Sequence, residues 1–138
     1  MTERRWVLWS MVTLLTAGGL ARVAATAQPH HDEPETVIVT LHAKAGAEGD
    51  LAAVVARHWE TARRLNLVLD APHLTMRGTE NGSQPYIVEI LTWRDASIPD
   101  AAPPAIQAIW AEMNRLVEPR GGRPGLDISE VSILGSQR

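Results

Sequence analysis

Apolar residues recur with two different periods along residues 36–134. Four segments, residues 36–44, 73–79, 86–93 and 126–134, are rich in apolar and β-branched side chains, which is typical of strands. Between them, apolar residues recur at spacings of three and four, the period of an amphipathic helix. The helical stripes comprise Leu51, Val55, His58, Ala62 and Leu65, and then Ile106, Ile109, Trp110, Met113 and Val117. The pattern therefore predicts the element order β-α-β-β-α-β.

Capping and turn residues mark where these elements begin and end. Asp50 is expected to cap the first helix. That helix ends before residues 70–72, because the proline there disfavours helical geometry in the residue before it. The Asn81-Gly82 pair predicts a hairpin between the second and third strands. Pro103-Pro104 suits the start of the second helix, where a missing N–H costs nothing.

The element order is that of the split βαβ, or ferredoxin-like, α+β unit. Right-handed crossovers place both helices on one face of a four-stranded antiparallel sheet. The sheet order is then 4-1-3-2, with the first and third strands in the centre. We therefore expect one ferredoxin-like domain over residues 36–138.

Both faces of the central strands are apolar. Val37, Ile38 and Val39 follow one another in the first strand, and the third strand contains Ile87-Val88 and Ile90-Leu91. A half-solvated antiparallel sheet would alternate apolar with polar residues, and the two helices can cover one face only. The second face therefore predicts an association surface. The simplest partner for it is a second copy of the chain, in a homodimer that packs sheet against sheet.

The first 27 residues have the pattern of a secretory signal peptide. Arg4-Arg5 precedes an uncharged, mostly apolar run over residues 6–21, and Ala25-Thr26-Ala27 supplies small residues for cleavage after Ala27. The run is shorter than the roughly 20 residues that span a bilayer, although an uncleaved anchor is the alternative. Sec export is the default, because the residues around Arg4-Arg5 match a twin-arginine signal poorly. We therefore expect a secreted or periplasmic protein, with residues 28–35 as a flexible linker.

Cleavage would change the charge of the chain. Three of the 13 basic residues and one of the 16 acidic residues lie in residues 1–27, so the mature chain of 111 residues would carry a formal charge of −5 instead of −3. An acidic domain is a poor match for nucleic acid, and no stable membrane association is expected after cleavage. The chain has no cysteine, which excludes disulfides, iron–sulfur clusters, cysteine zinc sites and a thiol nucleophile.

The residues of these elements resemble a known family. The element order, the long first helix, the Asn81-Gly82 hairpin and a third strand that ends in Thr92-Trp93-Arg94-Asp95 are similar to the dimeric α/β-barrel proteins. Among these, the chain resembles the antibiotic biosynthesis monooxygenase-like (ABM) domain over residues 36–134. The resemblance implies a dimeric α/β barrel. The activities of the family include cofactor-independent oxygenation of aromatic polyketides and haem degradation.

Two departures from the family pattern narrow what the resemblance implies. The second helix, residues 104–118, contains no histidine to serve as an axial haem ligand, so haem binding is not expected. The acidic residue often found just before the tryptophan is displaced to Glu89, four residues upstream of Trp93. What the resemblance implies is a cofactor-independent monooxygenase for a small aromatic or hydrophobic substrate, with no cofactor and no metal. The alternative is a non-enzymatic module that binds a small hydrophobic ligand.

His42 and Glu89 are the candidate catalytic residues. They lie on the two central strands, and a histidine paired with a carboxylate can act as a general base with an orienting partner. The pair requires that both side chains share one face of the sheet. In the alternative, His42 lies near the strand end and meets water, and Glu89 forms a structural ion pair with Arg77.

Five further residues are candidates for substrate binding, namely His58, Trp59, Tyr86, Trp93 and Trp110. His58 belongs to the apolar stripe of the first helix, where it faces either the core or a cleft between helix and sheet. The three tryptophans suit a pocket for an aromatic ligand, and Tyr86 is the only phenol in the chain. The alternative is that His58 and the tryptophans are core residues.

Overall fold

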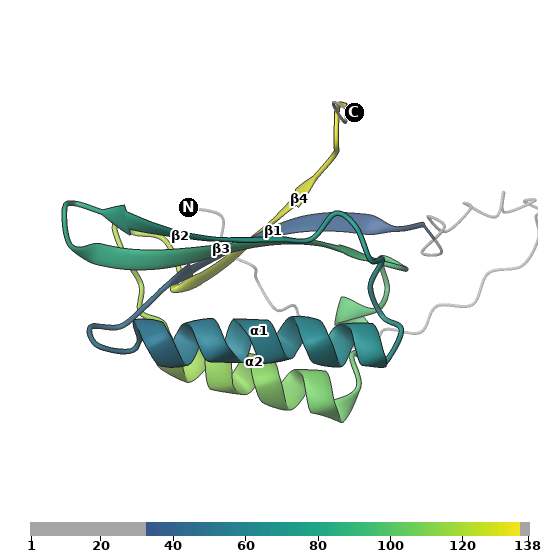
Figure 1. Ribbon diagram of the computed structural model, residues 1–138, viewed down its shortest axis with the longest axis horizontal. Helices are drawn as coiled ribbons and strands as arrows, with labels where there is room; N and C mark the ends of the chain where they lie inside the picture. The colour runs from purple at the N-terminus through teal and green to yellow at the C-terminus, as the bar shows by residue number, and fades with distance from the viewer. Residues whose placement is uncertain (1–32, 136–138) are drawn as a thin grey trace, which may run out of the picture.

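A computed structural model describes residues 33–135 of the chain (Figure 1). The elements follow in the order β1 (Glu35–His42), α1 (Glu48–Arg64), β2 (Leu74–Glu80), β3 (Gln84–Trp93), a short 3₁₀ helix η1 (Pro99–Ala101), α2 (Pro104–Leu116) and β4 (Leu126–Val131). The predicted order β-α-β-β-α-β is confirmed. The predicted signal peptide, residues 1–27, lies outside the described residues. Within residues 33–135, neither helix has the length and apolar character needed to cross a membrane.

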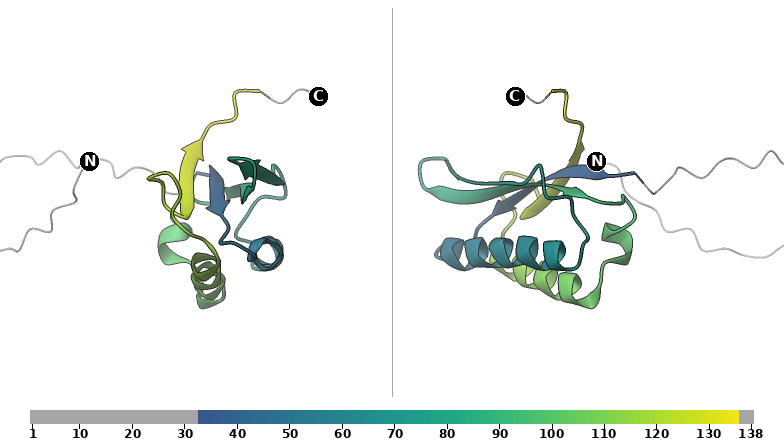
Figure 2. Two further views of the ribbon diagram at one scale, coloured as in Figure 1. Left: turned by 90° about the vertical axis from the view of Figure 1, so that its left-hand side faces the viewer. Right: turned by 45° about the vertical axis from the view of Figure 1, so that its right-hand side comes forward.

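The four strands form one antiparallel sheet in the order β2-β3-β1-β4. This is the predicted order 4-1-3-2 read from the other edge, with β1 and β3 in the centre. Both helices lie on one face of the sheet, and the other face is left open (Figures 1 and 2). The prediction of a ferredoxin-like α+β fold is therefore confirmed.

The register of the sheet decides which side chains face the helices. Val39 of β1 lies opposite Glu89 of β3 on one side and opposite Ile128 of β4 on the other. Side chains alternate between the two faces of a strand. The odd-numbered residues of β1 and β3 therefore face the helices, together with the even-numbered residues of β4. The even-numbered residues of β1 and β3 face the open side.

Local sequence sets the ends of most elements. Asn81 and Gly82 have φ angles of 48° and 80° and lie in the three-residue connection between Glu80 and Gln84, which confirms the predicted hairpin. Pro104 is the first residue of α2. In contrast, α1 begins at Glu48, so the expected cap at Asp50 is wrong. Glu48 and Asp50 both lie in the first turn of α1, where negative charge stabilises the positive end of the helix dipole.

The core fills the space between the sheet and the two helices. It consists of two clusters, one around Leu51 and Met113 and the other around Leu91 and Ile106. The side chains of Val39 and Trp110 pack against both clusters and are only partly buried themselves. A partly buried tryptophan at the junction of two clusters marks the place where the core opens to a cavity.

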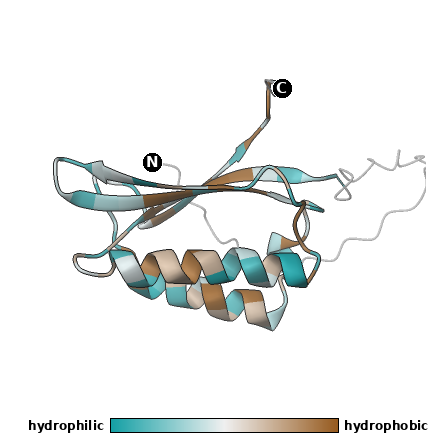
Figure 3. Ribbon diagram, viewed as in Figure 1, coloured by the Kyte–Doolittle hydropathy of each residue, from teal (hydrophilic) through white to brown (hydrophobic). Residues whose placement is uncertain are grey.

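The open face of the sheet is apolar, as its sequence predicts. Ile38, Val88 and Ile90 are half-buried on this face, and Leu74 and Met76 of the edge strand β2 are 49% and 43% exposed. Figure 3 shows hydrophobic segments in the middle of the sheet as well as on the helices. An apolar sheet face of this kind is typical of an association surface.

The Leu91→Ala variant tests the packing of the core. We expect the free energy of unfolding to fall by about 2–5 kcal/mol, because Leu91 is fully buried and its truncation leaves a cavity. Leu134→Ala is the control, since Leu134 is fully exposed and should change stability by less than about 0.5 kcal/mol. Urea unfolding followed by tryptophan fluorescence measures both. Similar losses for the two variants would contradict the described core.

Candidate functional site

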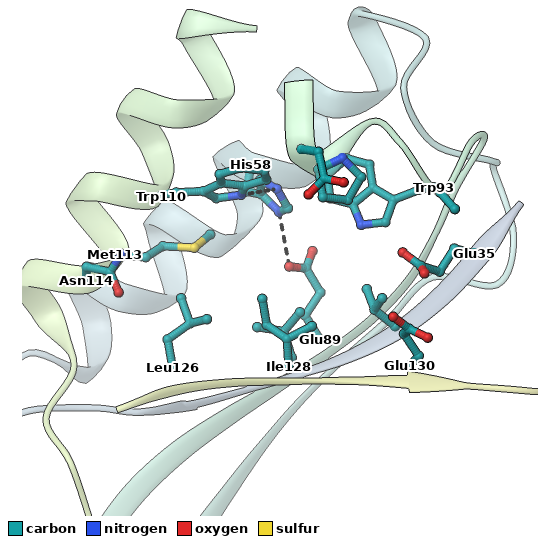
Figure 4. A pocket seen from close by; sticks show the side chains of 15 residues that line it. Glu35, His58, Glu89, Trp93, Trp110, Met113, Asn114, Leu126, Ile128 and Glu130 are labelled. Carbon is teal, nitrogen blue, oxygen red and sulfur yellow. Dashed lines mark hydrogen bonds and ion pairs between the residues drawn. The ribbon is translucent and has the colours of Figure 1, made fainter. Parts of the chain in front are cut away.

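A cavity of about 470 Å³ lies between the helix-facing side of the sheet and α2 (Figure 4). Its walls are mostly apolar, and the polar side chains that reach it come from β1, α1, β3, η1, α2 and β4. The lining residues are Glu35, Val37, Val39, His58, Glu89, Trp93, Ala96, Pro99, Asp100, Trp110, Met113, Asn114, Leu126, Ile128 and Glu130. The volume is within the usual range for a site that holds a small organic molecule.

Glu89 is the buried carboxylate of this site. It comes from the helix-facing side of β3 and is only 1% exposed. His58 Nδ1 lies 3.2 Å from its Oε2, and His73 Nε2 lies 3.3 Å from its Oε1. A carboxylate removed from water needs hydrogen-bond donors on its oxygens. The two histidines supply one donor for each oxygen.

Trp110 fixes the proton position on His58. The indole Nε1–H of Trp110 donates to His58 Nε2 at 3.1 Å. An indole N–H can only donate, so Nε2 must carry the lone pair. The proton of the neutral imidazole therefore lies on Nδ1, where it is donated to Glu89 (Figure 4). The result is a directed chain of hydrogen bonds from Trp110 through His58 to Glu89.

Aromatic packing holds this chain in place. The His58 and Trp93 rings meet edge to face, with centroids 5.9 Å apart and planes at 71°. The Trp93 and Trp110 rings are 6.2 Å apart at 88°. Edge-to-face contacts are a favoured geometry for aromatic rings, so these side chains form a rigid wall of the cavity.

His73 contacts Glu89 without lining the cavity. Its ring stacks on Trp59 with centroids 3.6 Å apart and planes 3° from parallel. The guanidinium of Arg63 lies 5.8 Å from the centroid of the Trp59 ring. His73 does not line the cavity, and its side chain is 22% exposed, so it connects the buried carboxylate with the protein surface.

The rim of the cavity is acidic. Glu35, Asp100 and Glu130 all line it, and no lysine or arginine of residues 33–135 does so. The pKa of Glu35 is raised above its ordinary value of 4.5, first by burial, then by the charge of Glu130, by a hydrogen bond with Glu130 and by the charge of Asp100. Burial is the largest cause of this shift, and the two neighbouring acidic residues act in the same direction.

The structure brings together three of the predicted ligand-binding residues. His58, Trp93 and Trp110 line the cavity. Trp59 lies beside the site, stacked on His73, but does not line the cavity. Tyr86 is even-numbered in β3 and lies opposite Gly78. Its side chain is therefore on the open face of the sheet, whereas the cavity is on the helix-facing side.

The predicted pairing of His42 with Glu89 is wrong. Val39 is the β1 residue opposite Glu89, so His42, three residues further on, faces the other side of the sheet. The alternative is also incorrect in its details. His42 is fully buried, with Nδ1 3.2 Å from the carbonyl oxygen of Pro124, and Arg77 pairs with Glu48 instead of Glu89.

Sequence reasoning missed His73 and the acidic rim. His73 lies just before β2, two residues from Thr75, which is paired with Glu89. Glu35 and Glu130 come from opposite ends of the chain and share a face because β1 and β4 are neighbours. Both facts depend on strand register, which the hydrophobic pattern alone does not give. The spacing of two residues from Glu35 to Val37 and from Val37 to Val39 was the available signal that Glu35 shares their face.

The side chains of His58, His73 and Glu89 meet here, and two histidines with one carboxylate also occur at non-haem iron sites. A histidine nitrogen must be unprotonated to bind a metal. The bond from Trp110 places the proton of His58 on Nδ1, the nitrogen that faces Glu89. Within residues 33–135, no group of three histidine, cysteine or acidic side chains has an arrangement that could hold a metal ion.

The Glu130→Gln variant tests the electrostatics of the rim. Removing this charge should lower the pKa of Glu35 toward 4.5, as measured by NMR titration of the carboxyl carbon. Because the folded pKa is raised, Glu35 favours the folded state below about pH 4.5, and this contribution is lost as the pH rises through the folded pKa. Glu130→Gln should reduce that loss. An unchanged Glu35 titration in this variant would contradict the described rim, and Glu60→Gln on α1 is the control.

Known proteins were compared with the chain by sequence and by fold. No protein-family model matches it, and no curated protein matches its sequence. A variant of SnoaB, a cofactor-independent oxygenase from Streptomyces nogalater, has a similar structure, with 16% identity, a TM-score of 0.56 and coverage of 75% of this chain and 96% of that one.

Two further solved structures are similar. Rv0793 from Mycobacterium tuberculosis has 14% identity and a TM-score of 0.57, over 77% of this chain and 100% of its own. An antibiotic biosynthesis monooxygenase has 14% identity and a TM-score of 0.55, over 73% and 99%. At these identities the likeness concerns the fold. The chain therefore shares its fold with these proteins, which include an antibiotic biosynthesis monooxygenase, and this is the fold that its sequence resemblance predicts.

Proposed function

We propose that the chain is an exported, cofactor-independent monooxygenase that acts on a small aromatic or hydrophobic substrate in this cavity. The observation that carries the proposal is the chain of hydrogen bonds from Trp110 through His58 to Glu89, at the wall of an apolar cavity of about 470 Å³. The similar structure of SnoaB, described as a cofactor-independent oxygenase, supports the same reaction class by analogy of fold.

His58 is the general base in this proposal. Its Nε2 carries the lone pair, and Glu89 behind Nδ1 stabilises the imidazolium that forms when Nε2 takes a proton. In the resting protein the Trp110 indole occupies Nε2. A substrate must take the place of that indole N–H to give up its proton. Trp110 thus keeps the base neutral and oriented until a ligand enters.

The reaction needs only the substrate and O₂. A CH₂ group activated by adjacent rings or a carbonyl loses a proton to His58, and the resulting carbanion bonds to one oxygen atom of O₂. The carbon then loses its second proton while the O–O bond breaks. This leaves a C=O group, and the other oxygen atom leaves as water with the two protons. The substrate supplies all four electrons that reduce O₂ to the carbonyl oxygen and water, so the balance closes without a cofactor.

The His58→Gln variant tests this role. We expect turnover to fall by about 10²- to 10⁴-fold, the usual contribution of a positioned general base. Oxygen uptake with anthrone, a ring compound with an activated CH₂ group, provides the measurement. Arg57→Gln is the control, because Arg57 forms an exposed ion pair with Glu112 outside the cavity. Full activity in His58→Gln would overturn the assignment of the base.

A non-enzymatic binding module is the second candidate function. The apolar walls and the rigid aromatic contacts would suit a small hydrophobic ligand without any reaction. The same measurement separates the two functions. Ligands that bind in the cavity but cause no oxygen uptake would favour the binding module.

The proposal includes a homodimer and export. A second copy of the chain covers the apolar open face of the sheet, which residues such as Ile38, Val88 and Ile90 supply. Residues 1–27 direct export by the Sec route, and the mature protein begins at Gln28 in a secreted or periplasmic location.

The Ile90→Glu variant tests the dimer. Light scattering should give the mass of two chains for the natural protein and of one chain for this variant, because a charge in an apolar interface loses its water without gaining a partner. Ala53→Glu, on the exposed side of α1, is the control and should remain a dimer. A natural protein with the mass of a single chain would contradict this part of the proposal.

A further inference from the structure

The charged side chains that line the cavity all have the same sign. Glu35, Asp100 and Glu130 stand at its rim and Glu89 lies inside, and no lysine or arginine of the described residues lines it. Glu89 is held by His58 and His73. The three rim carboxylates are therefore the charges that an entering ligand meets.

The rim carboxylates have no cationic partner in the described part of the chain. None of the ion pairs between residues 33 and 135 involves Glu35, Asp100 or Glu130. Burial raises the pKa of Glu35, and the neighbouring acidic side chains of Glu130 and Asp100 raise it further. A cation placed between these side chains would gain favourable interactions with all three.

A second, independent observation points to a ligand in the same cavity. Trp93 is only 4% exposed and lines the cavity. Its indole N–H has no hydrogen-bond partner within residues 33–135, and its nitrogen atom is not fully buried. The N–H therefore remains accessible in an otherwise buried side chain. A donor left open in a cavity wall is a group that a bound molecule can satisfy, and the π face of an aromatic ring is one acceptor for an N–H.

The walls behind the rim suit a ring system. Trp93 and Trp110 stand edge to face at 6.2 Å, and Val37, Val39 and Met113 complete the apolar surface around them. Tryptophan rings also attract cations, because their π faces are negative. Apolar walls bind the body of a ligand, and the acidic rim binds a positive group at its end.

We propose that the ligand of this cavity is an amine-bearing ring compound, whose apolar body lies against Trp93 and Trp110 and whose ammonium group lies among Glu35, Asp100 and Glu130. The inference rests on the proposed function only in using the same cavity. It names the substrate class that this cavity selects. A carboxylate or phosphate ligand is disfavoured because it would meet negative charge at every approach. A metal ion would leave the aromatic walls unused, and the described residues offer no three-ligand arrangement for one.

Three matched probes test the charge preference. They are 2-naphthylmethylamine, 2-naphthylmethanol and 2-naphthoate, which share a ring system and differ in charge. Binding to the purified protein at pH 7 is followed by quenching of tryptophan fluorescence. We expect the amine to bind about tenfold more tightly than the alcohol and the acid to bind most weakly, with a preference that shrinks at high salt. Equal affinities for amine and alcohol, or no binding of any probe, would overturn the proposal.

Two double variants assign the preference to the rim. Glu35→Gln with Glu130→Gln should remove most of the preference for the amine while the alcohol binds as before. Glu60→Gln with Glu112→Gln changes the charge of the protein equally, on residues that do not line the cavity, and should keep it. A preference that persists in the first pair or disappears in the second would contradict the proposal. Circular dichroism confirms that each variant is folded.

The outcome for the ligand class is separate from the outcome for the reaction. Tight amine binding without oxygen uptake would leave the ligand class intact and refute the monooxygenase. Oxygen uptake with neutral substrates, together with no preference for the amine, would do the reverse.

Discussion

The burial of one carboxylate determines how the helices and strands of this domain must meet. Moving an ionised carboxylate out of water is costly unless donors replace the lost water. Glu89 is 1% exposed in the central strand β3, and its two oxygens face His58 of α1 and His73 just before β2. Trp110 of α2 in turn fixes the proton of His58. Four separate segments of the chain therefore have to be in place before this group is satisfied.

Much of the fold follows from local patterns in the sequence. The alternation of strand and helix periods gives the element order, and the Asn81-Gly82 turn joins β2 to β3 with the expected positive φ angles. The ferredoxin-like order of strands then follows from the handedness of the crossovers. Helical spacing also places His58 on the face that meets the sheet, where it is buried.

The site is less accessible to sequence reasoning because it depends on register between strands that are distant in the chain. β1 and β3 are central neighbours, but α1, β2 and three connections separate them, so no tight turn fixes their alignment. A shift of one residue moves a side chain to the other face. This is why His42 was wrongly paired with Glu89, and why His73 and the neighbouring carboxylates Glu35 and Glu130 were missed.

The partial exposure of His73 determines how the buried Glu89 carboxylate is connected to solvent. Glu89 lines the cavity, and it also contacts His73, which does not line the cavity and has a side chain that is 22% exposed. The Nδ1 of His73 has no partner in the described residues and is not buried. A molecule that fills the cavity would leave this second contact in place. The buried carboxylate would therefore stay connected to bulk water through His73 while the site is occupied.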